Sequence, residues 1–243
     1  MAEEIKTETV TLPVSDGTSM PAYVARPTSA GPHPGLLVMQ EAFGVNAHIK
    51  DVTERFAREG YTAIAPALFH RTAPNFEGEY TNFEAAMPHM QALTDAGQTA
   101  DIQAAYQWLT TDGGASAVAS TGYCMGGRTS FLADILLPLK ASVSYYGGIA
   151  PSEGGGHFPD LLGKAADLHA PILLFWGGKD EHIGMKAVRA TEDALIAAGK
   201  PYAQVVFSQA DHGFFCDARA SYNPDAARQS WALTLEFLKT YVK

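Results

Sequence analysis

The stretch from Ala117 to Arg128 reads AVASTGYCMGGR, and it decides the fold. An apolar run that ends at Gly122 is followed at once by the pattern Gly-x-Cys-x-Gly and then by a helical pattern. A strand that turns directly into a helix, with a reactive residue at the turn, is a nucleophile elbow. Side chains at Gly122 and Gly126 would collide across so tight a turn. The sequence therefore predicts a nucleophile, Cys124, at the amino end of a helix.

The predicted turn would favour a reactive thiol at Cys124. The unpaired N–H groups and the macrodipole at the amino terminus of a helix favour a thiolate. The backbone N–H of Met125 would then be free to stabilise an oxyanion. A buried, inert cysteine is the competing interpretation, because free cysteine is among the most buried residue types. The strand before the cysteine and the helix after it favour catalysis.

Short apolar runs recur along the chain on both sides of this stretch. Their hydrophobicity is continuous, which is typical of strands covered on both faces in a parallel sheet. Between them lie segments with apolar residues at three- and four-residue spacing, which predict helices. Alternating strands and helices predict an α/β fold with a doubly wound, mostly parallel sheet and helices on both faces. The expected strands are 35–40, 61–68, 117–122, 141–146, 171–176 and 202–208, and the expected helices are 48–58, 99–110, 186–198 and 226–241.

The start of the chain has a different pattern. Segments 7–13 and 20–25 bracket the dipeptide Asp16-Gly17, which predicts an antiparallel hairpin at the edge of the sheet. Neither a repeat nor a low-complexity tract nor a long linker interrupts the 243 residues. We therefore expect a single domain over residues 1–243, since doubly wound folds reach this size around one sheet.

Composition argues against several classes of partner. Acidic residues outnumber basic ones by 26 to 17, and the formal charge of -9 would repel nucleic acid and anionic membrane surfaces. The polar amino terminus, and the lack of an apolar run of the ~20 residues that span a bilayer, predict a cytoplasmic protein with no membrane partner. The two cysteines, Cys124 and Cys216, form neither a disulfide framework nor a CxxC pair, so we expect no metal and no cofactor.

A cysteine nucleophile needs a base, and hydrolases with a nucleophile elbow order their triad as nucleophile, acid, histidine. His212 follows the last predicted strand, at the carboxyl end of the sheet, where active sites of open α/β folds assemble. It is the predicted base. Three other histidines follow Cys124, and each is more readily interpreted as a solvated surface residue: His157, His169 and His182.

The acid should follow the preceding strand, and Asp180 comes directly after a Gly-Gly-Lys turn at the end of 171–176. We expect it to hold the tautomer of His212 and to stabilise the imidazolium. A turn or helix cap is the competing interpretation, because Asp is common after Gly-Gly. Glu181 and Asp211 are the alternative acids.

A second charged position follows the predicted strand 35–40. The loop after this strand usually supplies the second oxyanion donor, here the backbone N–H of Ala42. Glu41 lies beside that donor at the end of an apolar strand, which favours a catalytic role or a role in tuning the thiol. A solvated loop residue is the competing interpretation.

With these positions in place, the chain resembles the dienelactone hydrolase family, also called the carboxymethylenebutenolidases. The resemblance covers nearly the whole length and implies an α/β-hydrolase fold. It is specific because several motifs occur together in family order. They are QEAFGVN at 40–46, GYCMGG at 122–127, YYG at 145–147, WGGKD at 176–180 and HGF at 212–214.

The resemblance implies a role for each matched position. Cys124, Asp180 and His212 match the triad, and the thiolate would form a thioester acyl-enzyme. Glu41 matches the glutamate that contacts the resting thiol and helps to generate the thiolate when substrate enters. The oxyanion amides would be those of Ala42 and Met125, and the substrate contacts Phe43, Tyr123, Tyr145, Phe214 and Cys216.

The chain departs from the family pattern at the carboxylate-binding positions. Characterised dienelactone hydrolases bind the substrate carboxylate with two arginines, one of them four residues after the histidine, where this chain has Cys216. Residues 72–127 contain no Lys or Arg, so the other arginine has no counterpart. Arg71 and Arg219 are the nearby candidates that could substitute. We expect neutral esters or lactones to be turned over at least as well as carboxylated dienelactones.

The leading interpretation is a hydrolase of small-molecule esters or lactones, as a monomer or a small homo-oligomer. One alternative is a general carboxylesterase or thioesterase of the same fold. Another is a non-catalytic binding protein, since fold does not fix function. A thiol redox protein that uses Cys124 and Cys216 is a third. The complete set of nucleophile, acid, base and oxyanion donors favours the hydrolase, and the lack of a CxxC pair counts against redox chemistry.

Overall fold

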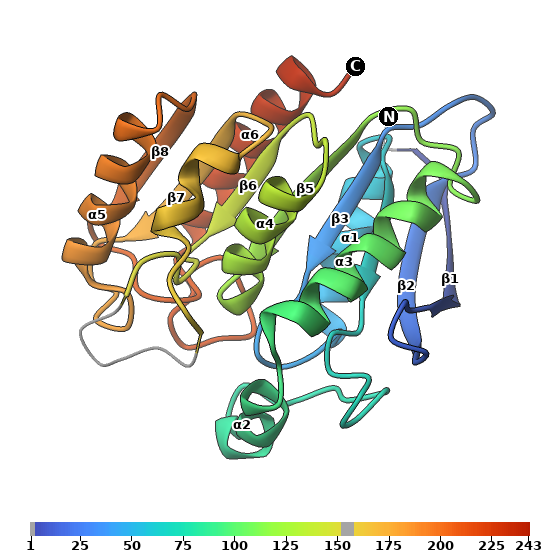
Figure 1. Cartoon of the computed structure of the whole chain (residues 1–243), viewed down its shortest axis with the longest axis horizontal. Coiled ribbons are helices and arrows are strands. Elements are labelled where there is room, and N and C mark those ends of the chain that lie inside the picture. Colours follow the sequence, from blue (N-terminus) through green and yellow to red (C-terminus); the bar gives the residue numbers. More distant parts are fainter. Residues whose placement is uncertain (1–2, 152–157) are drawn as a thin grey trace. The chain divides into compact units, whose positions relative to one another are not determined.

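Figure 1 shows the protein as a computed structural model that describes residues 3–151 and 158–243. His157, one of the alternative bases, lies outside the described residues. The chain divides into two compact units, residues up to 120 together with Lys243, and residues 121–242. Strand β5 (Val118–Tyr123) begins in the first unit and ends in the second. The single domain over residues 1–243 stays a prediction.

The first unit opens with the predicted hairpin. Strands β1 and β2 pair antiparallel from Ile5 opposite Pro27 to Pro13 opposite Ser19, which confirms the hairpin. Strand β2 pairs antiparallel with β4, and β4 pairs parallel with β3, so the order is β1-β2-β4-β3. The elements are β1 (Ile5–Pro13), β2 (Ser19–Pro27), β3 (Gly35–Met39), α1 (Ala47–Arg58), β4 (Thr62–Pro66), α2 (Phe83–Gln91) and α3 (Asp95–Thr110).

Helices cover both faces of the strands in the first unit. In Figure 1, α3 lies in front of these strands and α1 lies behind them. All residues of β3 and β4 are buried, which explains why their sequences are apolar without alternation. Helix α1 begins where the Asn46 side chain accepts a hydrogen bond from the Ile49 N–H at 3.2 Å, a standard amino-terminal cap.

The second unit is built on parallel strands. Strand β7 pairs parallel with β6 and with β8, in the order β6-β7-β8. All residues of β7 are buried, whereas β8 is partly exposed because it is the last strand in the order. In Figure 1, α4 lies in front of these strands and α6 behind. The elements are α4 (Met125–Leu136), β6 (Ser142–Tyr145), the short 3-10 helix η1 (Leu162–Asp167), β7 (Ile172–Gly177), α5 (Gly184–Ala197), β8 (Tyr202–Phe207) and α6 (Pro224–Tyr241).

The observed elements confirm the predicted fold class, a doubly wound, mostly parallel α/β sheet. Each predicted strand and helix is present, with shifts of a few residues at the ends. Helix α2 (Phe83–Gln91) was not expected from periodicity, because Ala86 is its one buried residue and it presents no apolar stripe. Within the described residues, no helix is both long enough and apolar enough to cross a membrane.

Candidate active site

The turn between β5 and α4 has the geometry of a nucleophile elbow. Cys124 caps the amino end of α4 with φ 56° and ψ -120°, a strained backbone conformation for a residue other than glycine. A Cβ atom on Gly122 would lie 1.9 Å from the carbonyl oxygen of Gly126, so only glycine fits there. The backbone N–H of Cys124 donates to the carbonyl oxygen of Tyr145 at 3.0 Å, which ties the turn to the end of β6. Cys124 is partly exposed, which argues against the interpretation of a buried cysteine.

His212 lies in the loop after β8 and is paired with Asp180. The His212 Nδ1 and the Asp180 Oδ2 are 2.8 Å apart. The other carboxylate oxygen, Oδ1, accepts the backbone N–H of Ile183 at 2.9 Å, and Asp180 is 5% exposed. The alternative acids do not replace it: Glu181 is exposed, and exposed Asp211 accepts the backbone N–H of His212 at 2.6 Å. Asp180 is therefore the acid hydrogen-bonded to the His212 ring.

A close approach of two backbones brings Asp180 to His212. A Cβ atom on Gly178 would lie 2.6 Å from the Cα of Ser208, so a larger residue would separate the turn after β7 from the end of β8. The N–H of Gly178 donates to the Phe207 carbonyl oxygen at 2.9 Å. Glycine at position 178 therefore allows the close approach that brings Asp180 to His212.

The charges around His212 favour its protonated form. Burial lowers the pKa of His212, but the negative charge of Cys124 and hydrogen bonds to Asp180 and Cys124 outweigh burial and raise that pKa to about 10. For Asp180, burial raises the pKa, and the hydrogen bond and charge of His212 more than compensate, so the pKa lies below its ordinary value. Asp180 and His212 thus form a carboxylate–imidazolium pair that reaches the Cys124 sulfur.

Two aromatic rings pack on the His212 imidazole, and sequence analysis assigned a role to neither. The Tyr146 ring lies 5.1 Å from it and the His182 ring 5.0 Å, both in edge-to-face geometry. Tyr146 has φ 41°, a positive value that is rare for a bulky residue and marks a strained site. His182 is exposed, as expected, yet it packs on the proposed base. A positive φ cannot be read from sequence, so no signal identified Tyr146.

The tyrosine before it, Tyr145, is turned into the interior. Its hydroxyl lies 2.7 Å from the Thr234 hydroxyl in α6, and its ring stacks on Tyr123 with centroids 4.7 Å apart. Phe214 is fully buried and packs on Tyr146 at 5.2 Å, and Cys216 is also fully buried. Substrate contact by these residues stays a prediction.

In the first unit, Glu41 follows β3 and is fully buried, which excludes the solvated interpretation. The hydroxyl of Tyr80 donates to its Oε2 at 2.8 Å. The ring of Phe43 packs on Tyr80 with centroids 4.6 Å apart, and Ala42 is 1% exposed. Tyr80 is thus the partner of the Glu41 carboxylate that sequence analysis missed, because it lies 39 positions away in an irregular segment.

The two candidate arginines differ in what they contact. Arg71 donates to both carboxylate oxygens of buried Asp101, at 2.9 and 2.8 Å, and to Asp16 at 2.8 Å. It is held in a structural ion-pair network. Arg219 lies against the backbone of Gly213, the residue after His212. A Cβ atom on Gly213 would lie 2.5 Å from the Arg219 Cζ. Arg219 is therefore the candidate that lies beside the acid–base pair.

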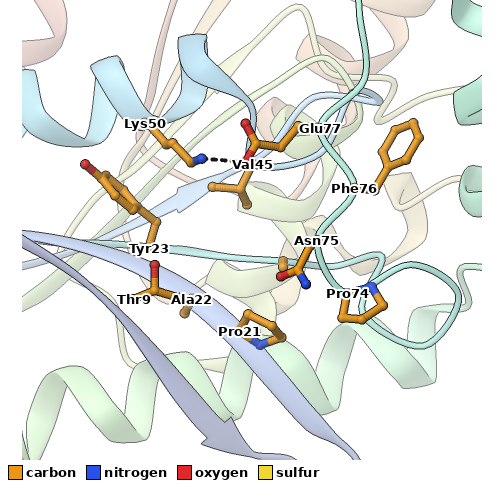
Figure 2. Close-up of a pocket in the computed structure, with 11 residues that line it drawn as sticks. Thr9, Pro21, Ala22, Tyr23, Val45, Lys50, Pro74, Asn75, Phe76 and Glu77 are labelled. Atoms are coloured by element: carbon orange, nitrogen blue, oxygen red, sulfur yellow. Dashed lines mark hydrogen bonds and ion pairs between the residues drawn. The ribbon is translucent and has the colours of Figure 1, made fainter.

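Figure 2 shows a pocket in the first unit, beside the Lys50–Glu77 ion pair. The rings of Pro21, Pro74 and Phe76 line its apolar part. Its volume is about 80 Å³, enough for two or three waters and well below the roughly 300 Å³ of the smallest usual ligand pockets. None of the predicted site residues lines it.

The doubly wound sheet and the strained turn before α4 place the chain in the class of α/β-hydrolases. The family model described as "Dienelactone hydrolase family" matches residues 20–242, and the chain belongs to this family. It is accordingly a dienelactone hydrolase-like hydrolase.

Relatives of known sequence and structure agree with this assignment. A Synechocystis sp. protein named "Putative carboxymethylenebutenolidase" is 36% identical, with 100% of both chains covered. A protein of the same name from Escherichia coli (strain K12) is 37% identical over 93% of this chain and 84% of its own length. A crystal structure from Klebsiella pneumoniae subsp. pneumoniae MGH 78578, named "Putative Dienelactone Hydrolase", is 36% identical and superposes with a TM-score of 0.89, covering 98% of this chain and 100% of the other.

Proposed function

We propose that this protein hydrolyses small esters or lactones through a triad of Cys124, His212 and Asp180 and a thioester acyl-enzyme. The observation that carries the proposal is the His212 imidazole, which is hydrogen-bonded to Asp180 at 2.8 Å and interacts with the Cys124 sulfur at the elbow. An acid–base pair that meets a thiol at a helix amino terminus is the arrangement that nucleophilic catalysis by cysteine needs.

In the first half of the reaction, the Cys124 thiolate attacks the carbonyl carbon and forms a carbon–sulfur bond. The carbonyl electron pair moves to oxygen, and the N–H of Met125 would stabilise this oxyanion, with the N–H of Ala42 as the second donor by family resemblance. The oxyanion then collapses, the carbon–oxygen bond to the leaving alkoxide breaks, and His212 gives its proton to that alkoxide. A thioester and a neutral imidazole remain.

In the second half, His212 takes a proton from water as the hydroxide adds to the thioester carbonyl. Collapse of this second oxyanion breaks the carbon–sulfur bond and returns the Cys124 thiolate and the carboxylic acid. The change of role has an electrostatic cause, because the negative charge of Cys124 raises the pKa of His212 and acylation removes that charge. His212 is thus an acid before acylation and a base after it.

Glu41 of the first unit belongs to the proposal by family resemblance. Glu41, held by the Tyr80 hydroxyl, would contact the resting thiol and assist formation of the thiolate when substrate binds. This role needs an enclosed carboxylate, and the complete burial of Glu41 supports it.

Iodoacetamide is expected to inactivate the enzyme by alkylating Cys124, and bound product is expected to slow the reaction. The thiol is partly exposed at a helix amino terminus beside an imidazolium, whereas Cys216 is fully buried. The measurement is the rate of activity loss together with peptide mass spectrometry. Activity loss with the label confined to Cys216 would contradict the assignment of the nucleophile.

A neutral lactone is expected to be turned over at least as well as its carboxylated analogue. A guanidinium–carboxylate contact contributes roughly 1.5–3 kcal/mol, and neither family arginine has a counterpart here. The measurement is kcat/KM for both substrates at low salt. A preference of ~10²-fold or more for the carboxylated lactone would contradict this expectation. Arg219→Ala would then identify the cation, with Arg71→Ala, which breaks a structural network, as the comparison.

The alternative functions are separated by the same measurements. A non-catalytic binding protein would show no turnover with any ester, lactone or thioester. A thiol redox protein needs a second reactive thiol, and the complete burial of Cys216 gives that function no support. A general carboxylesterase or thioesterase would prefer open-chain substrates to lactones. The cytoplasmic location and the monomeric or small homo-oligomeric state stay predictions.

A further inference from the structure

The turn that carries the acid also carries a second histidine. His182 follows Asp180 by two residues, and its ring packs on the His212 ring with centroids 5.0 Å apart and an interplanar angle of 75°. The turn is braced at Asp180, whose Oδ1 accepts the Ile183 N–H and whose carbonyl oxygen accepts the Gly184 N–H, both at 2.9 Å. His182 is therefore held beside His212 by the same backbone that holds the acid.

The imidazole of His212 is restrained by hydrogen bonds with Asp180 and Cys124 and by two rings. Asp180 orients its Nδ1, and the Tyr146 ring packs on it at 5.1 Å with an interplanar angle of 61°. The His182 ring makes the second ring contact. The hydrogen bonds fix the direction of the ring nitrogens, and the contacts with two rings limit tilting of the imidazole about those bonds.

The surroundings of His182 favour its neutral form. Burial lowers the pKa of His182 below its ordinary value, the charges of His212 and Arg219 lower it further, and the charge of Asp180 opposes them. A neutral ring can pack on the His212 imidazolium without the repulsion that a permanent cation at this position would cause.

We infer that His182 is a positioning residue for His212: its uncharged ring packs on the imidazole and limits the orientations of that ring, and it places no permanent positive charge beside it. The inference rests on the proposed function, because His212 must be the base. Poor alignment of a base by about 1 Å can cost up to about 10²-fold in rate, so loss of one of these restraints is expected to cost about tenfold.

The test uses three variants of the full chain. His182→Ala removes the ring, and we expect kcat to fall about tenfold with KM changed less than about threefold. His182→Phe restores an uncharged ring, and we expect it to recover kcat to within about threefold of wild type. His169→Ala, which changes an exposed histidine of the same unit, is the matched control and should retain wild-type kcat.

The charge is tested separately with His182→Lys. A permanent positive charge beside His212 disfavours the imidazolium, so the acid limb of the kcat profile should move to lower pH, by about half a pH unit. His182→Phe should leave that limb in place. The inference is overturned if His182→Ala keeps wild-type kcat, if phenylalanine fails to recover what alanine loses, or if lysine leaves the acid limb unmoved.

Cys124→Ala separates failure of this inference from failure of the proposed function. If Cys124→Ala is inactive and the His182 variants behave as wild type, the triad stands and the positioning role is wrong. If Cys124→Ala keeps its activity, the proposed function itself is wrong.

Discussion

Cys124→Ala is expected to lower kcat/KM for a small ester or lactone by at least ~10³-fold, in line with the loss of a nucleophile from other triads. Alanine cannot form the thioester, and activation of water by His212 is a poor substitute. The fold should be retained, because the backbone turn depends on the close approach of Gly122 to Gly126 and not on the sulfur. The measurement is steady-state kinetics on the purified variant.

Circular dichroism and thermal unfolding are the controls for this variant. A Tm within a few degrees of wild type would show that the lost activity reflects the missing thiol. Near wild-type turnover by a folded Cys124→Ala protein would contradict the assignment of the nucleophile. Cys216→Ala is the second comparison, because a redox function that needs both thiols would lose activity in either variant.

Asp180→Asn is expected to lower kcat by ~10²-fold or more. The carboxylate accepts a hydrogen bond from the Nδ1–H of His212 at 2.8 Å and stabilises the imidazolium. An asparagine amide that donates to Nδ1 instead would hold the wrong tautomer, and neither half of the reaction could use the imidazole as described. The hydrogen bond from the Ile183 N–H can be kept by the amide oxygen, so the turn should survive.

The matched controls for Asp180→Asn are Asp211→Asn and Glu181→Gln. Both residues are exposed, and Asp211 bonds to the backbone of His212 and not to its ring. Each control variant is expected to keep kcat within about threefold of wild type, because asparagine and glutamine keep an acceptor oxygen and the His212–Asp180 hydrogen bond is unchanged. A loss in Asp211→Asn as large as that in Asp180→Asn would move the role of the acid to Asp211.

Local sequence patterns were enough to predict the fold and the order of the proposed triad. Continuous apolar runs predicted the buried strands β3, β4 and β7, because a strand covered on both faces has no solvent-exposed face that needs polar residues. The elbow was predictable because its requirement for Gly122 is satisfied within five residues of chain. Asp180 and His212 were predictable from their positions after strands, since carboxyl ends of parallel strands meet at one edge.

Some predictions depended on contacts that a pattern cannot contain. Asp16-Gly17 predicted a hairpin, but Asp16 also binds Arg71, 55 positions away, and that contact removes Arg71 from the candidates for substrate binding. Likewise, the sequence motif placed Glu41 at the end of a strand, whereas its partner Tyr80 lies in a segment without regular structure.

By itself, the sequence determined the strand-turn-helix at Cys124 and the family, and it was enough to propose the order of nucleophile, acid and base. The tertiary structure decided which acid bonds to the ring, which arginine lies near it, and which rings pack on His212. The physical reason is that the first set depends on the backbone preferences of neighbouring residues, whereas the second depends on side chains brought together from distant parts of the chain. Tyr146 shows the difference, because its positive φ and the contact of its ring with His212 appear only in the structure, as does the hydrogen bond of its neighbour Tyr145 with Thr234.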